Sequence, residues 1–167
     1  MFSSQIIFAI SFLLLSPEAA AASEMTLQPV GKVKYSLGPF KLYTATLLAP
    51  NGVFSSDDTF DLELTYARNI SAKKLANASI IEMARLNQKP ESTFEPLRQP
   101  LVICFGDVNK GDQITGRKQD KNRAEFYRNG ALNCEIDHPN FSENFFSIWL
   151  SPEGRYPKKT ARLLGLN

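Results

Sequence analysis

Residues 126–152, with the sequence FYRNGALNCEIDHPNFSENFFSIWLSP, constrain the fold of this chain more than any other stretch. Within it, Asn129-Gly130 is a dipeptide that favours a two-residue type I′ hairpin turn, because both central residues of that turn need positive φ. A turn of this kind also sets which residues of the two strands face each other. The expected pairs are Arg128 with Ala131, Tyr127 with Leu132, and Glu125 with Cys134.

The same stretch predicts that a helix covers the hairpin. The apolar face of the hairpin is expected to consist of Tyr127, Leu132, Cys134 and Ile136. Residues 141–150 follow with apolar side chains at helical spacing, namely Phe141, Phe145, Ile148 and Trp149. This pattern indicates a sheet covered by helix, with an aromatic-rich space between the two.

The rest of the chain reads as strands, then helices, then strands, then helices. Alternation and β-branched content predict strands over 30–36, 40–48, 59–66 and 113–118. Helical patterns cover 72–86 and 157–164, while Pro96 and Pro100 predict a short helix, a kink or an irregular segment within 94–105. This order predicts an α+β fold, an antiparallel sheet with its helices gathered on one face.

The 72–86 helix has a recognisable start and an inward face. Ser71 precedes it and is expected to cap its first turn. The side chains expected to face inward are Leu75, Ser79, Met83 and Leu86. A Ser-x-x-Glu pattern at residues 92–95 further fits a capping box for a second helix.

The amino-terminal residues predict export. Residues 6–15 are almost uniformly apolar and a run of small residues follows at 19–23, as in a secretory signal peptide cleaved near Ala22. Residues 1–22 are therefore predicted to be a signal peptide and residues 23–167 one domain, periplasmic or secreted. An uncleaved anchor is the alternative, because residues 1–5 contain no Lys or Arg. The apolar run is shorter than the roughly 20 residues that span a bilayer, so no membrane span is expected after cleavage.

Cys104 and Cys134 are the two cysteines of the chain. In an exported protein an even number of cysteines permits a disulfide. Two buried thiols that pack as small apolar side chains are the alternative.

Charge and motif content exclude several classes of function. A net charge of +2 with both signs well mixed does not indicate a nucleic-acid partner. His138 is the single histidine, so neither a His-based zinc site nor most His-dependent catalysis is expected. No metal and no cofactor is predicted, since the chain has no phosphate-binding glycine loop and no Cys-x-x-Cys. The sequence does not indicate an oligomeric state.

The predicted space between sheet and helices has a few polar groups in mostly apolar surroundings, which is typical of sites for small lipophilic ligands. A filled core with locally satisfied hydroxyls is the alternative. The polar residues expected there are Tyr43, Thr44, Tyr66, Tyr127 and Ser147.

Five segments together resemble the bacterial branch of the chalcone isomerase-like family. They are FKLYTATLLAP, FDLELTYARNISAKKLANASIIEMARL, DVNKGDQITG, FYRNGALNCEID and FFSIWLSP, in the family's order and across nearly all of residues 30–164. The resemblance implies an open-faced β-sandwich, in which a long antiparallel sheet is covered on one face by a layer of helices, with a ligand cleft between them.

The resemblance transfers the residues of the plant enzymes only in part. Thr44 lies at the position of the catalytic threonine, Lys32 at that of the arginine, and Ser147 at that of a cleft Thr or Ser. Leu75 replaces the catalytic tyrosine and Glu82 replaces an asparagine. Leu75 cannot donate a hydrogen bond to an enolate, so cyclisation of a chalcone is not expected.

The leading hypothesis is an exported, non-catalytic protein that binds a small lipophilic ligand, with a fatty acid as one candidate. Relatives that bind fatty acids hold the carboxylate with an Arg and a Tyr, and Lys32 with Tyr43 or Tyr127 is the corresponding candidate set here. One alternative is an isomerase or lyase that uses Lys32 and Thr44 on an enone-like substrate. The other is a structural or interaction module of the cell envelope. The deciding observation is an apolar cavity beneath the 72–86 helix with Lys32 at its mouth.

Overall fold

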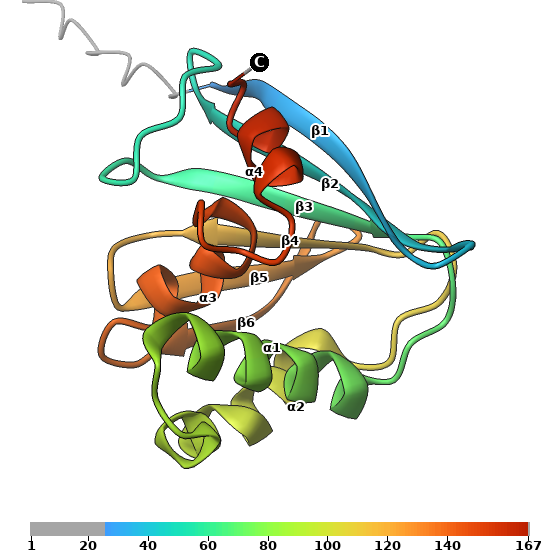
Figure 1. The fold of residues 1–167 in the computed structure, drawn as a ribbon, viewed down its shortest axis with the longest axis vertical. Coiled ribbons are helices and arrows are strands. Elements are labelled where there is room, and N and C mark those ends of the chain that lie inside the picture. The colour runs from blue at the N-terminus through green and yellow to red at the C-terminus, as the bar shows by residue number, and fades with distance from the viewer. Residues whose placement is uncertain (1–25, 167) are drawn as a thin grey trace, which may run out of the picture.

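The computed structural model describes residues 26–166, and within them one antiparallel sheet of six strands supports the fold (Figure 1). Every strand pairs with its neighbours along the chain, so the order across the sheet is β1-β2-β3-β4-β5-β6. The strands are β1 (Leu27–Leu37), β2 (Phe40–Pro50), β3 (Phe60–Tyr66), β4 (Gln113–Lys118), β5 (Arg123–Arg128) and β6 (Ala131–Asp137).

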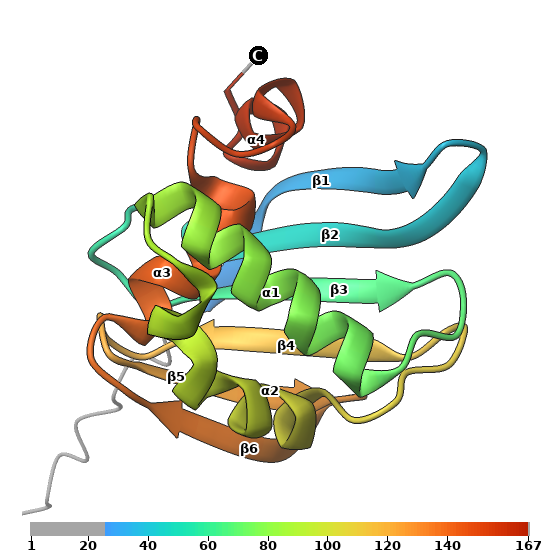
Figure 2. The same ribbon diagram turned by 60° about the horizontal axis from the view of Figure 1, so that its bottom comes forward.

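The helices gather on one face of this sheet, as the α+β prediction requires (Figure 2). Helices α1, α2 and α3 cover that face, and α4 lies beside β1 at the edge. Within residues 26–166 no helix is both long enough and apolar enough to cross a bilayer. The helical elements are α1 (Ala72–Asn87), the 3₁₀ helix η1 (Glu91–Leu97), α2 (Arg98–Phe105), α3 (Phe141–Leu150) and α4 (Pro157–Leu163).

The contact between α4 and β1 depends on Gly31. A Cβ atom at this position would collide with the carbonyl oxygens of Arg162 and Leu163. Glycine therefore allows the end of α4 to approach the strand backbone closely. Leu163 is fully buried at this contact and belongs to the same core as the rest of the sheet.

The core fills the space between the helices and the inner face of the sheet. Helix α3 has the predicted bounds of residues 141–150 and supplies the aromatic part of the core. Phe145 lies at its centre, with ring contacts of 5.3–6.1 Å linking most of the cluster. The aromatic side chains in this cluster are Phe105, Phe126, Phe141, Phe145, Phe146 and Trp149.

The β5–β6 hairpin has the predicted turn but not the predicted faces. Asn129 and Gly130 have φ values of 49° and 84°, and Tyr127 pairs with Leu132 as expected. A bulge then shifts the register, so that Cys134 faces Phe126 instead of Glu125. The extra residue moves every side chain beyond it to the opposite face.

The inner face of the hairpin consequently differs from the prediction. Phe126 and Ile136 are buried and Cys134 packs against the core. The assignment of Tyr127 and Leu132 to this face is wrong: Leu132 is 61% exposed, and Tyr127 lies on the outer face. The bulge lies between Leu132, which points outward, and Cys134 and Ile136, which point inward.

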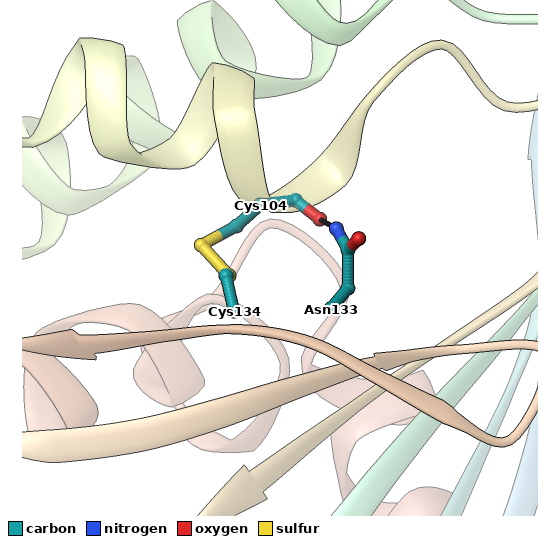
Figure 3. Close-up of a disulfide and its surroundings, with 3 residues drawn as sticks. All are labelled: Cys104, Asn133 and Cys134. Atoms are coloured by element: carbon teal, nitrogen blue, oxygen red, sulfur yellow. Dashed lines mark hydrogen bonds between the residues drawn. A yellow bond between two sulfur atoms is a disulfide. The ribbon is translucent and has the colours of Figure 1, made fainter.

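A disulfide joins Cys104 of α2 to Cys134 of β6, with 5.3 Å between their Cα atoms (Figure 3). Asn133, the bulged residue beside Cys134, donates a hydrogen bond from Nδ2 to the Cys104 carbonyl oxygen at 2.7 Å. The bulge therefore places two adjacent residues against the end of α2. Together the covalent bond and the hydrogen bond hold α2 on the edge strand of the sheet.

Helix α1 is capped from a distance rather than by Ser71. Ser71 occupies the N-cap position but makes no side-chain cap bond. Asp107 Oδ1 instead accepts the Ala72 N–H at 2.8 Å, from the loop after α2. The buried face of α1 is also shifted from the prediction, since Leu75 and Leu86 are only half-buried. The buried residues are Ala72, Ala76, Ser79, Ile80, Met83 and Ala84.

The proline-containing segment forms two short helices. Pro96 lies inside the 3₁₀ helix η1, and Pro90 occupies its N-cap, so the predicted capping box at 92–95 is not used. Pro100 lies in the first turn of α2, where its missing N–H would have no intrahelical partner in any case.

Candidate functional site

A cavity of about 200 Å³ lies between the inner face of the sheet and the helices. Its floor comes from alternate residues of the strands, including Leu62 and Leu64 of β3 and Ile114 of β4. Helices α1 and α3 form its roof, and the loop between α3 and α4 borders it. The walls are predominantly apolar, as in a site for a lipophilic molecule.

Three tyrosines form a row along one side of the cavity. Tyr35 of β1 stacks on Tyr43 of β2 at 5.0 Å between ring centroids, and Tyr43 lies 5.8 Å from Tyr66 of β3. These three residues face one another because Tyr43 pairs with both of the others in the strand register. Tyr156, before α4, meets Tyr35 edge-on at 5.8 Å.

The hydroxyl groups of this row differ in their partners. Tyr43 Oη accepts a hydrogen bond from Trp149 Nε1 at 3.1 Å. Tyr35 and Tyr66 are each 5% exposed, and neither hydroxyl has a hydrogen-bond partner within residues 26–166. Their side chains line the cavity, so these two hydroxyls can hydrogen-bond to a ligand or to water there.

Burial keeps these tyrosines in the neutral form. It raises the pKa of Tyr35 to about 12, with a smaller contribution from Tyr156. Burial also raises the pKa of Tyr43 and Tyr66. The row therefore supplies hydrogen-bond donors rather than phenolate bases near neutral pH.

Charged residues border the cavity on one side. Glu82 of α1 and Arg155 of the α3–α4 loop both line it, and the Arg155 guanidinium forms an ion pair with the Glu82 carboxylate. Arg85 forms a second ion pair with Glu82 at 3.0 Å and also donates to the Glu153 carbonyl oxygen. Two guanidinium groups thus share the Glu82 carboxylate at this border.

Lys159 of α4 adds a further cation near this border. Its Nζ lies 4.9 Å from the ring centroids of both Tyr35 and Tyr156, and it donates a hydrogen bond to the Lys34 carbonyl oxygen at 2.9 Å. The ammonium group is therefore fixed between two aromatic rings that line the cavity.

The structure brings four of the predicted residues to the cavity: Tyr43, Tyr66, Leu75 and Glu82. It does not place Lys32 at the mouth. Lys32 lies on the outer face of the sheet because the adjacent Val33 points into the core. Burial and Asp61 raise the pKa of Glu63 on that outer face, and the charge of Lys32 acts in the opposite direction.

Thr44 and Tyr127 also lie on the outer face. Thr44 pairs with Thr65 of β3, which is exposed, while its neighbour Tyr43 faces the cavity. Tyr127 donates a hydrogen bond to Glu125 at 2.6 Å, and the Arg117 guanidinium lies 5.2 Å from its ring. The isomerase alternative through Lys32 and Thr44 therefore has no support from the placement of these two residues.

Ser147 lies on the other side of α3, where it lines a second cavity of about 270 Å³. Its hydroxyl donates to the Asn144 carbonyl oxygen at 2.7 Å. The buried Lys118 also lines this cavity, and its ammonium group donates to the carbonyl oxygens of Asp57 and Asp58. Ser147 is thus separated from the tyrosine row by the helix that carries it.

Sequence reasoning missed Tyr35, Trp149 as a hydrogen-bond donor, and Arg155. The alternation of Val33 and Tyr35 on one strand face was the signal for Tyr35. Arg155 had no such signal, because it lies in an irregular loop and reaches the cavity only through the tertiary fold.

Comparisons with known proteins agree with this architecture. A family model described as chalcone isomerase-like matches residues 22–165. A Haemophilus influenzae protein described as uncharacterized is 27% identical over 139 residues, which span 83% of this chain and 68% of that protein. The crystal structure of an Arabidopsis thaliana fatty-acid binding protein superposes with a TM-score of 0.65 and 12% identity, covering 83% of this chain and 87% of that one.

Proposed function

The chain belongs to the chalcone isomerase-like family, and from this premise we propose that it is a non-catalytic binding protein for a small lipophilic molecule with an anionic head group. The observation that carries the proposal is the apolar cavity bordered by the Arg155–Glu82–Arg85 cluster. A medium-chain fatty acid fits this combination of apolar walls and guanidinium groups at the border. The solved neighbour that is named a fatty-acid binding protein supports the same ligand class.

The size of the cavity narrows the ligand. Pockets for drug-sized molecules measure roughly 300–1,000 Å³, while an apolar cavity of about 150 Å³ accommodates benzene. A volume of about 200 Å³ lies between these cases. It favours a medium-length acyl chain over a long one. One water needs roughly 10–15 Å³, and the cavity is more than ten times larger, which argues against a filled core.

The residues at the cavity support binding rather than catalysis. Leu75, which the resemblance aligns with the plant catalytic tyrosine, lines the cavity and has no hydrogen-bond donor. Tyr35 and Tyr66 supply neutral hydroxyls, and Arg155 supplies a guanidinium that suits a carboxylate. In this proposal a bound carboxylate competes with Glu82 for Arg155, while the acyl chain lies against the phenylalanines of α3.

Native mass spectrometry after mild purification tests the proposal, together with titration by octanoate, palmitate and octanol. We expect a co-purified lipophilic molecule or uptake of octanoate, with weaker binding of octanol. A protein that carries nothing and takes up none of these ligands would refute the function.

An Arg155→Gln variant tests the role of the head group. Loss of a charge-assisted hydrogen bond is worth about 1.5–3 kcal/mol, so octanoate affinity is expected to fall about tenfold or more while octanol affinity is unchanged. Arg162→Gln is the matched control, because Arg162 is exposed on α4 and does not line the cavity. Equal losses of octanoate affinity in the two variants would show that Arg155 does not bind the head group.

Export is part of the same proposal. The apolar run at residues 6–15 and the small residues before Ala22 support cleavage of a signal peptide, a prediction that lies outside the described residues. A disulfide between Cys104 and Cys134 suits an oxidising compartment. Intact-mass analysis of the protein from fractionated cells should give a chain that begins near residue 23 in the periplasmic or secreted fraction.

A further inference from the structure

One end of the sheet is strongly basic. Residues 30–50 contain three lysines and no acidic residue, and residues 64–81 contain three basic residues and no acidic one. The strand register places the ends of both segments together, where β1 turns into β2 and β3 leads to α1. The exposed basic residues in these segments and in the neighbouring loop before β4 are Lys32, Lys34, Lys41, Arg68, Lys73, Lys74 and Lys110.

Contacts bring these loops together around the β1–β2 turn. The Ala67 N–H donates to the Leu42 carbonyl oxygen at 2.8 Å, and the Lys110 N–H donates to Asn69 Oδ1 at 2.9 Å. Both ribbon views show the β1–β2 turn and the loop after β3 at the same end of the sheet (Figures 1 and 2). The segments that carry these basic residues therefore meet at one end of the sheet.

Acidic residues do not neutralise this region. Asp107, in the same loop as Lys110, accepts the Ala72 N–H with Oδ1 and supplies one negative charge against the several exposed cations of this region. Asp112 forms an ion pair with Arg128 at 2.7 Å. The exposed acids Asp57, Asp58 and Asp120 lie in the loops at the opposite end of the sheet.

The tip of the β1–β2 hairpin is apolar within this basic region. Leu37 and Phe40, on either side of Gly38-Pro39, are 66% and 61% exposed. The space beside Gly38 is open, and the Arg68 guanidinium lies 5.7 Å from the Phe40 ring. A pair of exposed apolar side chains on a protruding turn, surrounded by cations, combines the two features that attract proteins to anionic lipid surfaces.

We propose that the β1–β2 tip docks this protein on an anionic lipid bilayer. Leu37 and Phe40 enter the interfacial layer, and the surrounding cations contact the phosphate groups of the lipids. Each basic side chain near such a surface adds an attraction that salt screens. The acidic loops at the far end orient the molecule with this tip toward the membrane.

The docked orientation brings the binding cavity close to the lipids. Tyr35, which lines the cavity, precedes Leu37 by two residues on the same strand. Docking by the tip is independent of whether the cavity holds a ligand, and it can be measured on its own.

A tryptophan at the tip reports docking locally. With phosphatidylglycerol vesicles, we expect the fluorescence emission of the Phe40→Trp variant to shift to shorter wavelength and to be quenched by brominated lipids. Neither change is expected with phosphatidylcholine vesicles or at high salt. Val53→Trp is the control, because Val53 is 69% exposed in an acidic loop at the other end. The unsubstituted protein gives the background from the buried Trp149. No change in Phe40→Trp, or an equal change in Val53→Trp, would overturn the proposal.

Charge variants separate lipid docking from other contacts. Replacing Lys41 and Lys110 by Gln in the Phe40→Trp protein should weaken binding to the anionic vesicles by roughly fivefold per lysine. Replacing Lys89 and Lys121, which are exposed and remote from the tip, should have little effect. Equal losses from both pairs would show attraction by net charge alone, and would also overturn the proposal.

Discussion

The indole N–H of Trp149 donates a hydrogen bond to the Tyr43 hydroxyl at 3.1 Å, which joins the roof of the cavity to its floor. Trp149 belongs to α3 and Tyr43 to β2, and the two residues are 106 positions apart. The bond leaves the Tyr43 ring stacked on Tyr35 and leaves the hydroxyls of Tyr35 and Tyr66 free for a ligand. It therefore stabilises the fold and determines which donors face the cavity.

Substitution of Tyr43 by Phe should destabilise the protein. The buried Trp149 N–H would lose its acceptor, and an unsatisfied buried donor costs about 1–3 kcal/mol. Urea unfolding should therefore give a lower free energy of unfolding by this amount. Tyr127→Phe is the control, because the Tyr127 hydroxyl bonds to Glu125 on the half-exposed outer face, and its effect should be smaller. Equal losses in the two variants would contradict the structural role of the Trp149–Tyr43 bond.

A large side chain at Ala78 should block ligand binding without unfolding the protein. Ala78 is exposed on α1 and lines the cavity, so an Ala78→Trp side chain would cover its opening. Octanoate affinity measured by calorimetry should fall at least tenfold, with an unchanged melting temperature. Lys73→Trp, on the exposed side of the same helix, should bind octanoate normally. Unchanged binding in Ala78→Trp would mean that ligands enter elsewhere.

Loss of the disulfide should lower stability substantially. The Cys104–Cys134 bond closes a loop with a sequence separation of 30, for which chain entropy gives about 3–4 kcal/mol. The double variant Cys104→Ala, Cys134→Ala should therefore unfold at a lower urea concentration. A phosphine reductant should destabilise the natural protein and leave the double variant unchanged. If the reductant also destabilised the double variant, the loss of stability would not come from this disulfide.

The tyrosine row should make the protein sensitive to alkali. The folded-state pKa of Tyr35 is about 12, against an ordinary value of 10.0. As pH rises above about 10, the unfolded chain loses its phenolic proton first, so unfolding becomes more favourable. The stability that the neutral Tyr35 retains below pH 10 is therefore lost progressively between pH 10 and 12.

Urea unfolding across this pH interval measures the effect. Tyr35→Phe should reduce the slope of stability against pH, because a phenylalanine cannot ionise. Lysines also titrate in this interval, so the comparison is between the two proteins rather than within one. Identical slopes would show that Tyr35 does not resist ionisation in the folded state.

The elements of the fold were predictable because their signals are local. The Asn129-Gly130 turn and the helical spacing of Phe141, Phe145 and Trp149 depend on neighbouring residues only, and both are confirmed. The bulge at Asn133 was not predictable, since the disulfide and the Asn133 bond to α2 arise from a distant element. That single extra residue reverses the faces of Tyr127 and Leu132.

The site was less predictable than the fold. Tyr43 and Glu82 line the cavity as predicted, whereas the family resemblance implies a site position for Lys32 that strand alternation excludes. Val33 and Tyr35 point inward, so Lys32, which directly precedes Val33, has to point outward. Arg155 takes the place expected for Lys32, and it comes from a loop whose position depends on the packing of α4.

The walls of the cavity come from both halves of the sequence. Tyr35 and Tyr43 lie near the start of the described residues, while Trp149 and Arg155 lie near their end. Although every strand pairs with its sequence neighbours, no partial chain that ends before α3 can enclose a ligand. A ligand of the proposed kind would therefore bind only the completed fold, and its binding would stabilise that fold by mass action. The ligand would add stability only after the last helices have packed on the sheet.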